Sequence, residues 1–168
     1  YNLEPEIFSL VMFRAFLQFL EKKQTCRIHI KLETGMNRLG IVKEDLPSLI
    51  ELLQAHKNVK VTSIFSHLAG ADSAVHDEFS KQQVSQFLTG AGSIIMAIGY
   101  RPILHILNSP GALRLPQFQM DMIRLGIGLY GIDPTEEDFK ALKSVVTLKT
   151  LISQIKSLEE GETVGYNR

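Results

Sequence analysis

The sequence predicts an α/β fold made of parallel βα units, about half of an eight-unit barrel, followed by the start of a β-rich region. Short apolar runs with strand alternation recur between segments with helical periodicity. About four such units fit before Pro134, whereas a complete barrel takes about 250 residues. After Pro134 the rhythm changes to one long alternating run.

The first unit combines a helix and a strand. Pro5 suits a first helical turn, and polar residues recur every three to four positions over residues 6–22, which leaves a broad apolar face. Residues 26–31 then alternate as a strand does. Gly35 and Gly40 mark the loop that follows.

The next unit repeats this order. A helix over residues 45–56 places its leucines on one face, and residues 59–66 read as a strand. A long amphipathic helix over residues 77–98 follows, and Gly99 stands at the position that commonly ends a helix.

Two shorter segments complete the barrel-like part. Residues 103–107 predict a buried strand, and Ser109-Pro110 predicts an N-cap followed by proline in the first turn of a helix. One more strand is expected over residues 122–124, before a stretch punctuated by glycines.

The pattern beyond Pro134 predicts a second domain. We expect a helix over residues 135–142, a strand over the alternating run 145–158 and a turn at Glu159-Glu160-Gly161. The domains are therefore a partial β/α barrel over residues 1–134, and a linker with the first strands of a β-rich domain over residues 135–168.

Composition excludes several classes of function. Eighteen basic residues balance 18 acidic ones and lie scattered, so we expect no nucleic-acid partner. No apolar run is long enough to span a bilayer, and no membrane role is expected. A single cysteine, Cys26, fits a reducing cytoplasm. The chain begins without methionine, and both ends look cut.

Candidate chemical residues follow the predicted strands, where parallel β/α folds place their sites. They are Arg38, His67, Asn108-Ser109, Arg124 and Gly126-Ile127. The helix beginning at Ser109 and the bare amides near Gly126 suit a phosphate. Arg124 lies among apolar residues, where a cation needs a partner such as a ligand ring nitrogen or phosphate.

Each candidate also has a structural explanation. His67 fits a core histidine with a satisfied hydrogen bond, and Asn108-Ser109 fits a simple helix cap. Arg124 alternatively pairs with a structural carboxylate, and Lys31 and Arg38 alternatively flank a solvated loop. The other histidines show no metal-ligand spacing, so no metal is assigned, and no nucleotide-binding glycine motif is present.

Five blocks in order give a specific resemblance to the alanine racemases. The chain resembles that family in Lys31-Leu-Glu-Thr-Gly-Met-Asn-Arg38-Leu-Gly40, Phe65-Ser-His67-Leu-Ala-Gly-Ala-Asp72, His105-Ile-Leu-Asn108-Ser109, Ile123-Arg124-Leu-Gly126-Ile127-Gly-Leu-Tyr130-Gly131 and Gly161-Glu-Thr-Val-Gly165-Tyr166. The resemblance covers nearly the whole chain. It implies the second half of a (β/α)8 barrel, followed by the start of a β-rich C-terminal domain.

The resemblance also implies a role for each matched residue toward pyridoxal 5'-phosphate. Arg124 would contact the pyridine nitrogen, and His67 would pack on the ring with Asn108 nearby. Ser109, Gly126 and Ile127 would bind the phosphate. Tyr166 would be a catalytic base, and Arg38 would orient it. Lys31 matches a lysine that many members carbamylate.

As a whole, the resemblance implies a cytoplasmic homodimer that interconverts L-alanine and D-alanine for peptidoglycan precursors. The reaction would run through a pyridoxal-phosphate aldimine by two-base proton transfer. The family's cofactor-binding lysine belongs to an earlier strand, upstream of Tyr1, so the chain alone is expected to be inactive. The matched blocks are also shared by serine and broad-specificity racemases.

Two other functions compete with this interpretation. The first is a non-catalytic pyridoxal-phosphate-binding barrel protein, which has a single domain and therefore lacks a segment like 145–158. The second is an amino-acid decarboxylase of the same fold class. Those enzymes place a carboxylate at the pyridine nitrogen, where this chain offers Arg124.

Overall fold

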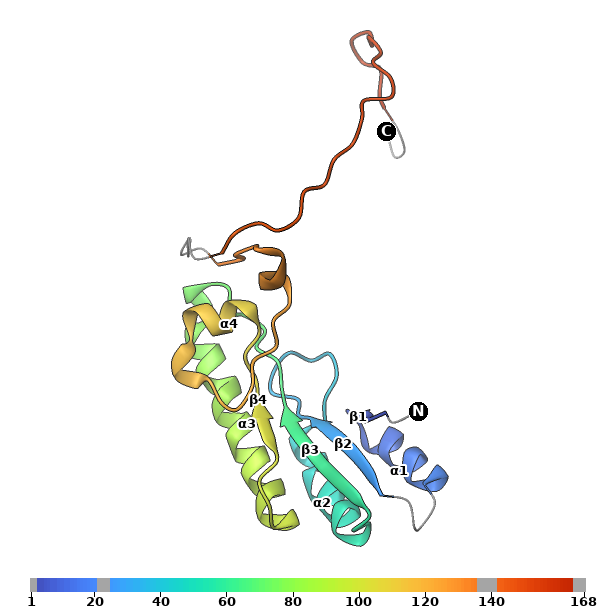
Figure 1. Ribbon diagram of the computed structural model, residues 1–168, viewed down its shortest axis with the longest axis vertical. Coiled ribbons are helices and arrows are strands. Elements are labelled where there is room, and N and C mark those ends of the chain that lie inside the picture. The colour runs from blue at the N-terminus through green and yellow to red at the C-terminus, as the bar shows by residue number, and fades with distance from the viewer. Residues whose placement is uncertain (1–2, 21–24, 136–141, 165–168) are drawn as a thin grey trace.

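Four parallel strands form one sheet in the order in which they occur along the chain (Figure 1). A computed structural model describes residues 3–20, 25–135 and 142–164. The strands are β1 (Glu6–Ile7), β2 (Cys26–Lys31), β3 (Val59–Phe65) and β4 (Ile103–His105). All three pairings are parallel, which confirms the predicted βα architecture.

The first element differs from its prediction. Residues 6–7 form strand β1, and helix α1 (Leu10–Phe19) begins only after Ser9, whose hydroxyl accepts a hydrogen bond from the amide of Met12 at 3.2 Å. Pro5 precedes the strand, and its carbonyl accepts a hydrogen bond from the amide of His29. The predicted helix over residues 6–22 was wrong at its start because pairing with β2 outweighs helical periodicity there.

The other long helices match their predictions closely. A 3-10 turn, η1 (Lys43–Asp45), leads into α2 (Leu46–Ala55). Another, η2 (Ala74–His76), leads into α3 (Asp77–Ile98), which ends at Gly99 in the left-handed conformation, with φ +78°. Helix α2 packs against α3. The side chains most fully buried between helices and sheet include Ile28, Ile30, Leu49, Ile64 and Phe87.

The region after β4 is less regular than expected. Asn108, and not Ser109, caps α4 (Ser109–Arg114), which is followed by η3 (Pro116–Phe118). Residues 122–124 do not form the predicted strand. Two isolated backbone hydrogen bonds tie this coil to the chain beside it, from the amide of Asp121 to the carbonyl of Leu104 and from that of Arg124 to the carbonyl of Leu107. The last short helix is η4 (Ile127–Tyr130).

Residues 142–164 extend away from the sheet (Figure 1). The expected strand over residues 145–158 is absent, because this segment pairs with no other described strand. The expected turn is present: the amide of Glu162 donates to the carbonyl of Glu159, and Gly161 has φ +91°. Most of the helix expected over residues 135–142 lies outside the described residues.

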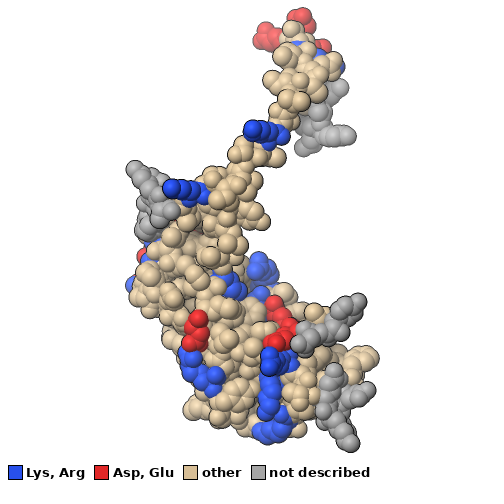
Figure 2. Space-filling view, in the orientation of Figure 1, with Lys and Arg blue, Asp and Glu red and all other residues tan. Residues whose placement is uncertain are grey.

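The surface agrees with the balanced composition. Lysine, arginine, aspartate and glutamate side chains lie singly or in small groups on the face shown in Figure 2, without one dominant patch. Within the described part of the chain, no helix has the length and apolar character of a membrane span.

Candidate functional site

The candidate residues meet at the carboxyl ends of the strands. The loop carrying Arg38 follows β2, His67 follows β3 by two residues, and Asn108 follows β4. Parallel strands end at the same edge of a sheet, so these loops become neighbours although they are far apart in sequence. Arg124 arrives from the coil beside β4 and contacts two of them.

Arg124 is the centre of this cluster. Its guanidinium donates to the Nδ1 atom of His105 and to the carbonyl oxygens of Ser66 and Ile106, the last at 3.3 Å. Burial lowers the pKa of Arg124, and the carboxylate of Glu6 opposes that shift. Among the described residues its hydrogen-bond acceptors are carbonyl oxygens and imidazole nitrogens, so the alternative of a directly bonded structural carboxylate is not what the structure shows.

His67 lies between Arg124 and Asn108. Its Nδ1 atom is 3.4 Å from a guanidinium nitrogen of Arg124, and its Nε2 atom is 3.4 Å from the amide nitrogen of Asn108. Burial lowers the pKa of His67 to about 4, helped by the positive charges of Arg124, Arg38 and Lys31. The imidazole is therefore neutral near pH 7 and able to accept a hydrogen bond from Arg124.

Ser109, Gly126 and Gly128 form a small cradle of polar groups. The hydroxyl of Ser109 accepts hydrogen bonds from the amides of Gly126 at 2.9 Å and Gly128 at 3.1 Å. A Cβ atom at residue 128 would lie 3.2 Å from that hydroxyl oxygen, which favours glycine there. Ile127 stands between the two glycines as the first residue of η4. Two amides that converge on one oxygen are the donors that an anion requires.

Lys31 and Arg124 share an aromatic platform. The amine of Lys31 lies 5.6 Å from the ring centre of Phe65, and the guanidinium carbon of Arg124 lies 5.1 Å from it. The Phe65 ring also stacks on His105, with centroids 4.9 Å apart. Lys31 is buried and lies 3.5 Å from a carboxylate oxygen of Glu6. The sequence did not identify Glu6, Phe65 or His105 as members of the site.

Arg38 is exposed in the loop between β2 and η1. The structure does not bring it into contact with the cluster, but its charge acts on His67. Burial would raise the pKa of Glu33 in the same loop, and hydrogen bonds from backbone amides, that of Asn37 foremost, outweigh it and lower the pKa. Gly40 closes the loop at φ +148°, where a Cβ atom would lie 2.5 Å from the backbone nitrogen of Glu33. Tyr166 lies outside the described residues.

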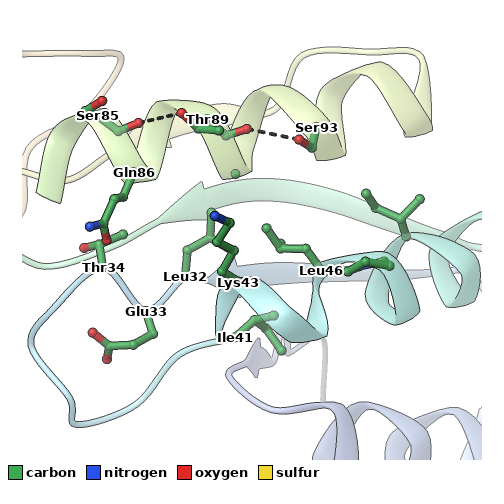
Figure 3. A pocket seen from close by; sticks show the side chains of 13 residues that line it. Leu32, Glu33, Thr34, Ile41, Lys43, Leu46, Ser85, Gln86, Thr89 and Ser93 are labelled. Atoms are coloured by element: carbon green, nitrogen blue, oxygen red, sulfur yellow. Dashed lines mark hydrogen bonds between the residues drawn. The ribbon is translucent and has the colours of Figure 1, made fainter. Parts of the chain in front are cut away.

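A separate groove of about 640 Å³ lies between α2 and α3 (Figure 3), and its lining includes none of Arg124, His67, Asn108 and Ser109. Its wall includes Leu32, Ile41 and Leu46. Hydroxyls on α3 face it, but that of Thr89 donates to Ser85 at 2.9 Å and that of Ser93 to Thr89 at 3.2 Å, both along the helix. These hydroxyls are therefore engaged along their own helix, whereas the polar groups around Arg124 converge on one another, and the cluster at the strand ends is the better candidate site.

Comparisons with known proteins agree on one family. The model of the alanine racemase N-terminal domain matches residues 1–134. An alanine racemase of Carboxydothermus hydrogenoformans is 35% identical over 99% of this chain and 46% of its own length. Alanine racemase 2 of Bacillus subtilis is 32% identical over 99% and 44%. The chain thus spans less than half the length of these curated relatives.

Solved structures give the same result. Alanine racemase from Corynebacterium glutamicum superposes with a TM-score of 0.76 at 25% identity, over 85% of this chain and 40% of that one. Alanine racemase from Bartonella henselae, solved with covalently bound pyridoxal phosphate, superposes with a TM-score of 0.73 at 26% identity, over the same shares of the two chains.

Proposed function

This chain belongs to the family of the alanine racemase N-terminal domain, and from that premise we propose that it is part of an alanine racemase dependent on pyridoxal 5'-phosphate. The observation that carries the proposal is the pairing of a half-buried arginine with an anion cradle. Arg124 stands next to a neutral His67, and two residues later Gly126 contributes an amide to the cradle at Ser109.

The residues fit such a cofactor on chemical grounds. Arg124 offers donors to a pyridine nitrogen, and His67 offers a flat, neutral ring to stack on the pyridine. Ser109, Gly126 and Ile127 would hold the phosphate, and in the structure the Ser109 hydroxyl takes the acceptor position between two amides. When bound, the cofactor supplies an electron-withdrawing ring that acidifies the α-proton of an attached amino acid.

Arg124 would limit how strongly the ring withdraws electrons. A guanidinium has only donors and keeps its protons, so it hydrogen-bonds a ring nitrogen without protonating it. Its orientation is fixed by Ser66, His105 and Ile106, which leave little freedom for it to turn. This restraint favours return of the proton to the same carbon and disfavours decarboxylation.

Inversion at a carbon needs one base on each face, and we assign one of them to the phenol oxygen of Tyr166. Arg38 would orient that phenol from the loop that Gly40 closes. The second base would be the family's cofactor-binding lysine, from a strand before this chain. We propose that the enzyme is a cytoplasmic homodimer in which Tyr166 serves the partner's site. L-alanine and D-alanine would be the substrates, and the product would supply peptidoglycan precursors.

The resemblance makes Lys31 a candidate for carbamylation, but the charges around it argue against that modification. Glu6 already gives its ammonium a partner at 3.5 Å, and a carbamate would set a second negative charge beside that carboxylate. The arrangement therefore favours unmodified Lys31 for as long as Glu6 is present.

The wider fold follows from the same proposal. Residues 1–134 would be the second half of a (β/α)8 barrel, and residues 135–168 would be a linker with the first strands of a β-rich C-terminal domain. Residues 145–158 would then pair with strands in the rest of that domain, and their exposed apolar side chains would be buried there.

Racemisation by the complete protein tests this function. We expect Arg124→Glu to lower turnover by at least about 100-fold, because a carboxylate would let the ring nitrogen take a proton. Arg14→Glu, on the exposed side of α1, is the matched control and should keep full activity. Binding of the cofactor without any turnover by the unaltered protein would instead identify a non-catalytic pyridoxal-phosphate carrier.

A further inference from the structure

A row of polar side chains runs across the sheet from Arg124 to Glu4. Apart from Arg124, none of the side chains in this row has a role in the proposed reaction. The Nε2 atom of His105 on β4 lies 3.2 Å from the hydroxyl of Ser63 on β3. That hydroxyl lies 2.6 Å from Nδ1 of His29 on β2, and Nε2 of His29 lies 3.3 Å from a carboxylate oxygen of Glu4.

The strands place these groups side by side. His29 pairs with Ser63 because the register of β2 and β3 shifts after Ile28, which leaves Thr62 as an extra residue. The hydroxyl of Thr62 donates to Glu4 at 2.8 Å, and Arg27 holds the other carboxylate oxygen at 3.4 Å. The carboxylate at the end of the row is therefore anchored from both strands.

The guanidinium at one end of the row and the carboxylate at the other, which lies at ion-pair distance from His29, set the direction of the hydrogen bonds between them. A guanidinium has only donors, so Nδ1 of His105 must accept from Arg124. A neutral His105 then carries its proton on Nε2 and donates to Ser63. The single hydroxyl proton of Ser63 is left for Nδ1 of His29, whose Nε2–H meets a carboxylate that only accepts.

We propose that Arg124, His105, Ser63, His29 and Glu4 form one hydrogen-bonded chain in which each donor points from Arg124 toward Glu4, and that Glu4 and His29 are positioning residues for Arg124. In this chain each histidine accepts a hydrogen bond at Nδ1 and donates from Nε2. The chain itself stands on the contacts above, while its use in positioning a pyridine contact rests on the proposed function.

Burial makes the chain costly to break. Ser63 is 1% exposed and His105 is 4% exposed, and an unpaired polar group at such sites pays its full desolvation cost. Burial and the charge of Arg124 lower the pKa of His105 to about 4, which agrees with a neutral ring near pH 7. A change at Glu4, which three intervening side chains separate from Arg124, should therefore reach the guanidinium through these contacts.

Nitrogen-15 NMR of histidine in a protein that carries the complete chain tests the direction of the donors. The signals are assigned with His29→Gln and His105→Gln variants. At pH 7 we expect both rings in the Nε2–H tautomer. A proton on Nδ1 of either ring, alone or together with one on Nε2, would overturn the chain whether or not the protein racemises alanine.

Proton exchange at the guanidinium of Arg124 tests the positioning role. We expect Glu4→Ala and Ser63→Ala to speed exchange about tenfold, because each removes a hydrogen bond from the row. Glu44→Ala changes an exposed glutamate, and Ser80→Ala removes a buried hydroxyl that has no hydrogen-bond partner in the described structure, so neither should change the rate. Exchange in Glu4→Ala equal to that in Glu44→Ala would overturn the role of Glu4. It would do so even if Ser63→Ala failed to fold.

Discussion

The carboxyl ends of the strands and residues 142–164 differ in how far their side chains are satisfied by contacts within the described chain. Around Arg124, polar side chains from strands β2, β3 and β4 and from the loops after β3 and β4 contact one another within the chain. In residues 142–164 the apolar side chains remain exposed, Leu148 at 97% and Leu151 at 92%. The first region is held in place by hydrogen bonds among its own residues. The second region has exposed apolar side chains that are not buried by the described part of the chain.

The largest expected effect tests whether Tyr166, which follows the second region in sequence, completes the site of the first. Tyr166→Phe in the complete protein should lower racemisation by about 100-fold to 10,000-fold, because the substitution removes a proton-transferring group. Mixed dimers of Tyr166→Phe with a variant that lacks the cofactor-binding lysine should regain at most about half of the activity, since one of two independent sites is intact. Mixed dimers that form and stay inactive would show that Tyr166 does not act across the interface.

A core substitution should separate the two regions by stability. Phe87 is fully buried between α3 and the sheet, so Phe87→Ala should lower the free energy of unfolding by about 3–5 kcal/mol. Leu148→Ser changes a side chain that contacts little, and should stay within about 0.5 kcal/mol in the isolated chain. Urea denaturation measures both. A loss at Leu148 comparable to that at Phe87 would mean that residues 142–164 pack on the sheet.

Acid should weaken the first region selectively. The pKa of His105 falls from 6.5 to about 4 on folding, so the unfolded state binds more protons between these values. Stability is therefore complete above pH 6.5 and declines toward pH 4, by on the order of 3 kcal/mol. Urea midpoints measured across this range should fall less in His105→Gln than in the unaltered protein. Parallel pH curves would contradict a neutral, buried His105.

Local patterns predicted the regular elements of the first region. Strand β2 and helix α3 have the predicted bounds, because alternation, periodicity and Gly99 are read within one segment. Strand β1 was missed because two residues become a strand only through pairing with β2. The run over residues 145–158 was predicted as a strand for the opposite reason, since its pattern is present and the described residues offer it no partner strand.

The residues of the candidate site also fall into two groups, those that local sequence position predicts and those that only tertiary packing reveals. Residues directly after strands, such as His67 and Asn108, were found because parallel strands end at one edge of the sheet. His105 and Phe65 were missed because they lie inside strands, where side chains usually serve packing. Their importance depends on Arg124, which reaches them from residues far along the chain through tertiary packing.

Two glycines, one in each region, allow the same substitution to be compared, and the expected effects are the smallest of those considered. Gly40 and Gly161 both have positive φ, of +148° and +91°, so alanine is disfavoured at each by about 1 kcal/mol or more. At residue 40 the new Cβ atom would also lie 2.5 Å from the backbone nitrogen of Glu33, whereas nothing lies within 4 Å of one at residue 161.

We therefore expect Gly40→Ala to lower the free energy of unfolding by about 1–3 kcal/mol and to displace the loop that carries Arg38. Gly161→Ala should leave global unfolding of the isolated chain unchanged, because the turn at residues 159–162 buries no side chain there, and a local cost does not reach the cooperative transition. Hydrogen exchange resolves the two: faster amide exchange in the Gly40→Ala loop, including Gly35, and no change at the sheet in Gly161→Ala. Equal unfolding midpoints for the two variants would show that the loop after β2 is no more constrained by the fold than the turn in residues 142–164, and the contrast between the two regions would fail.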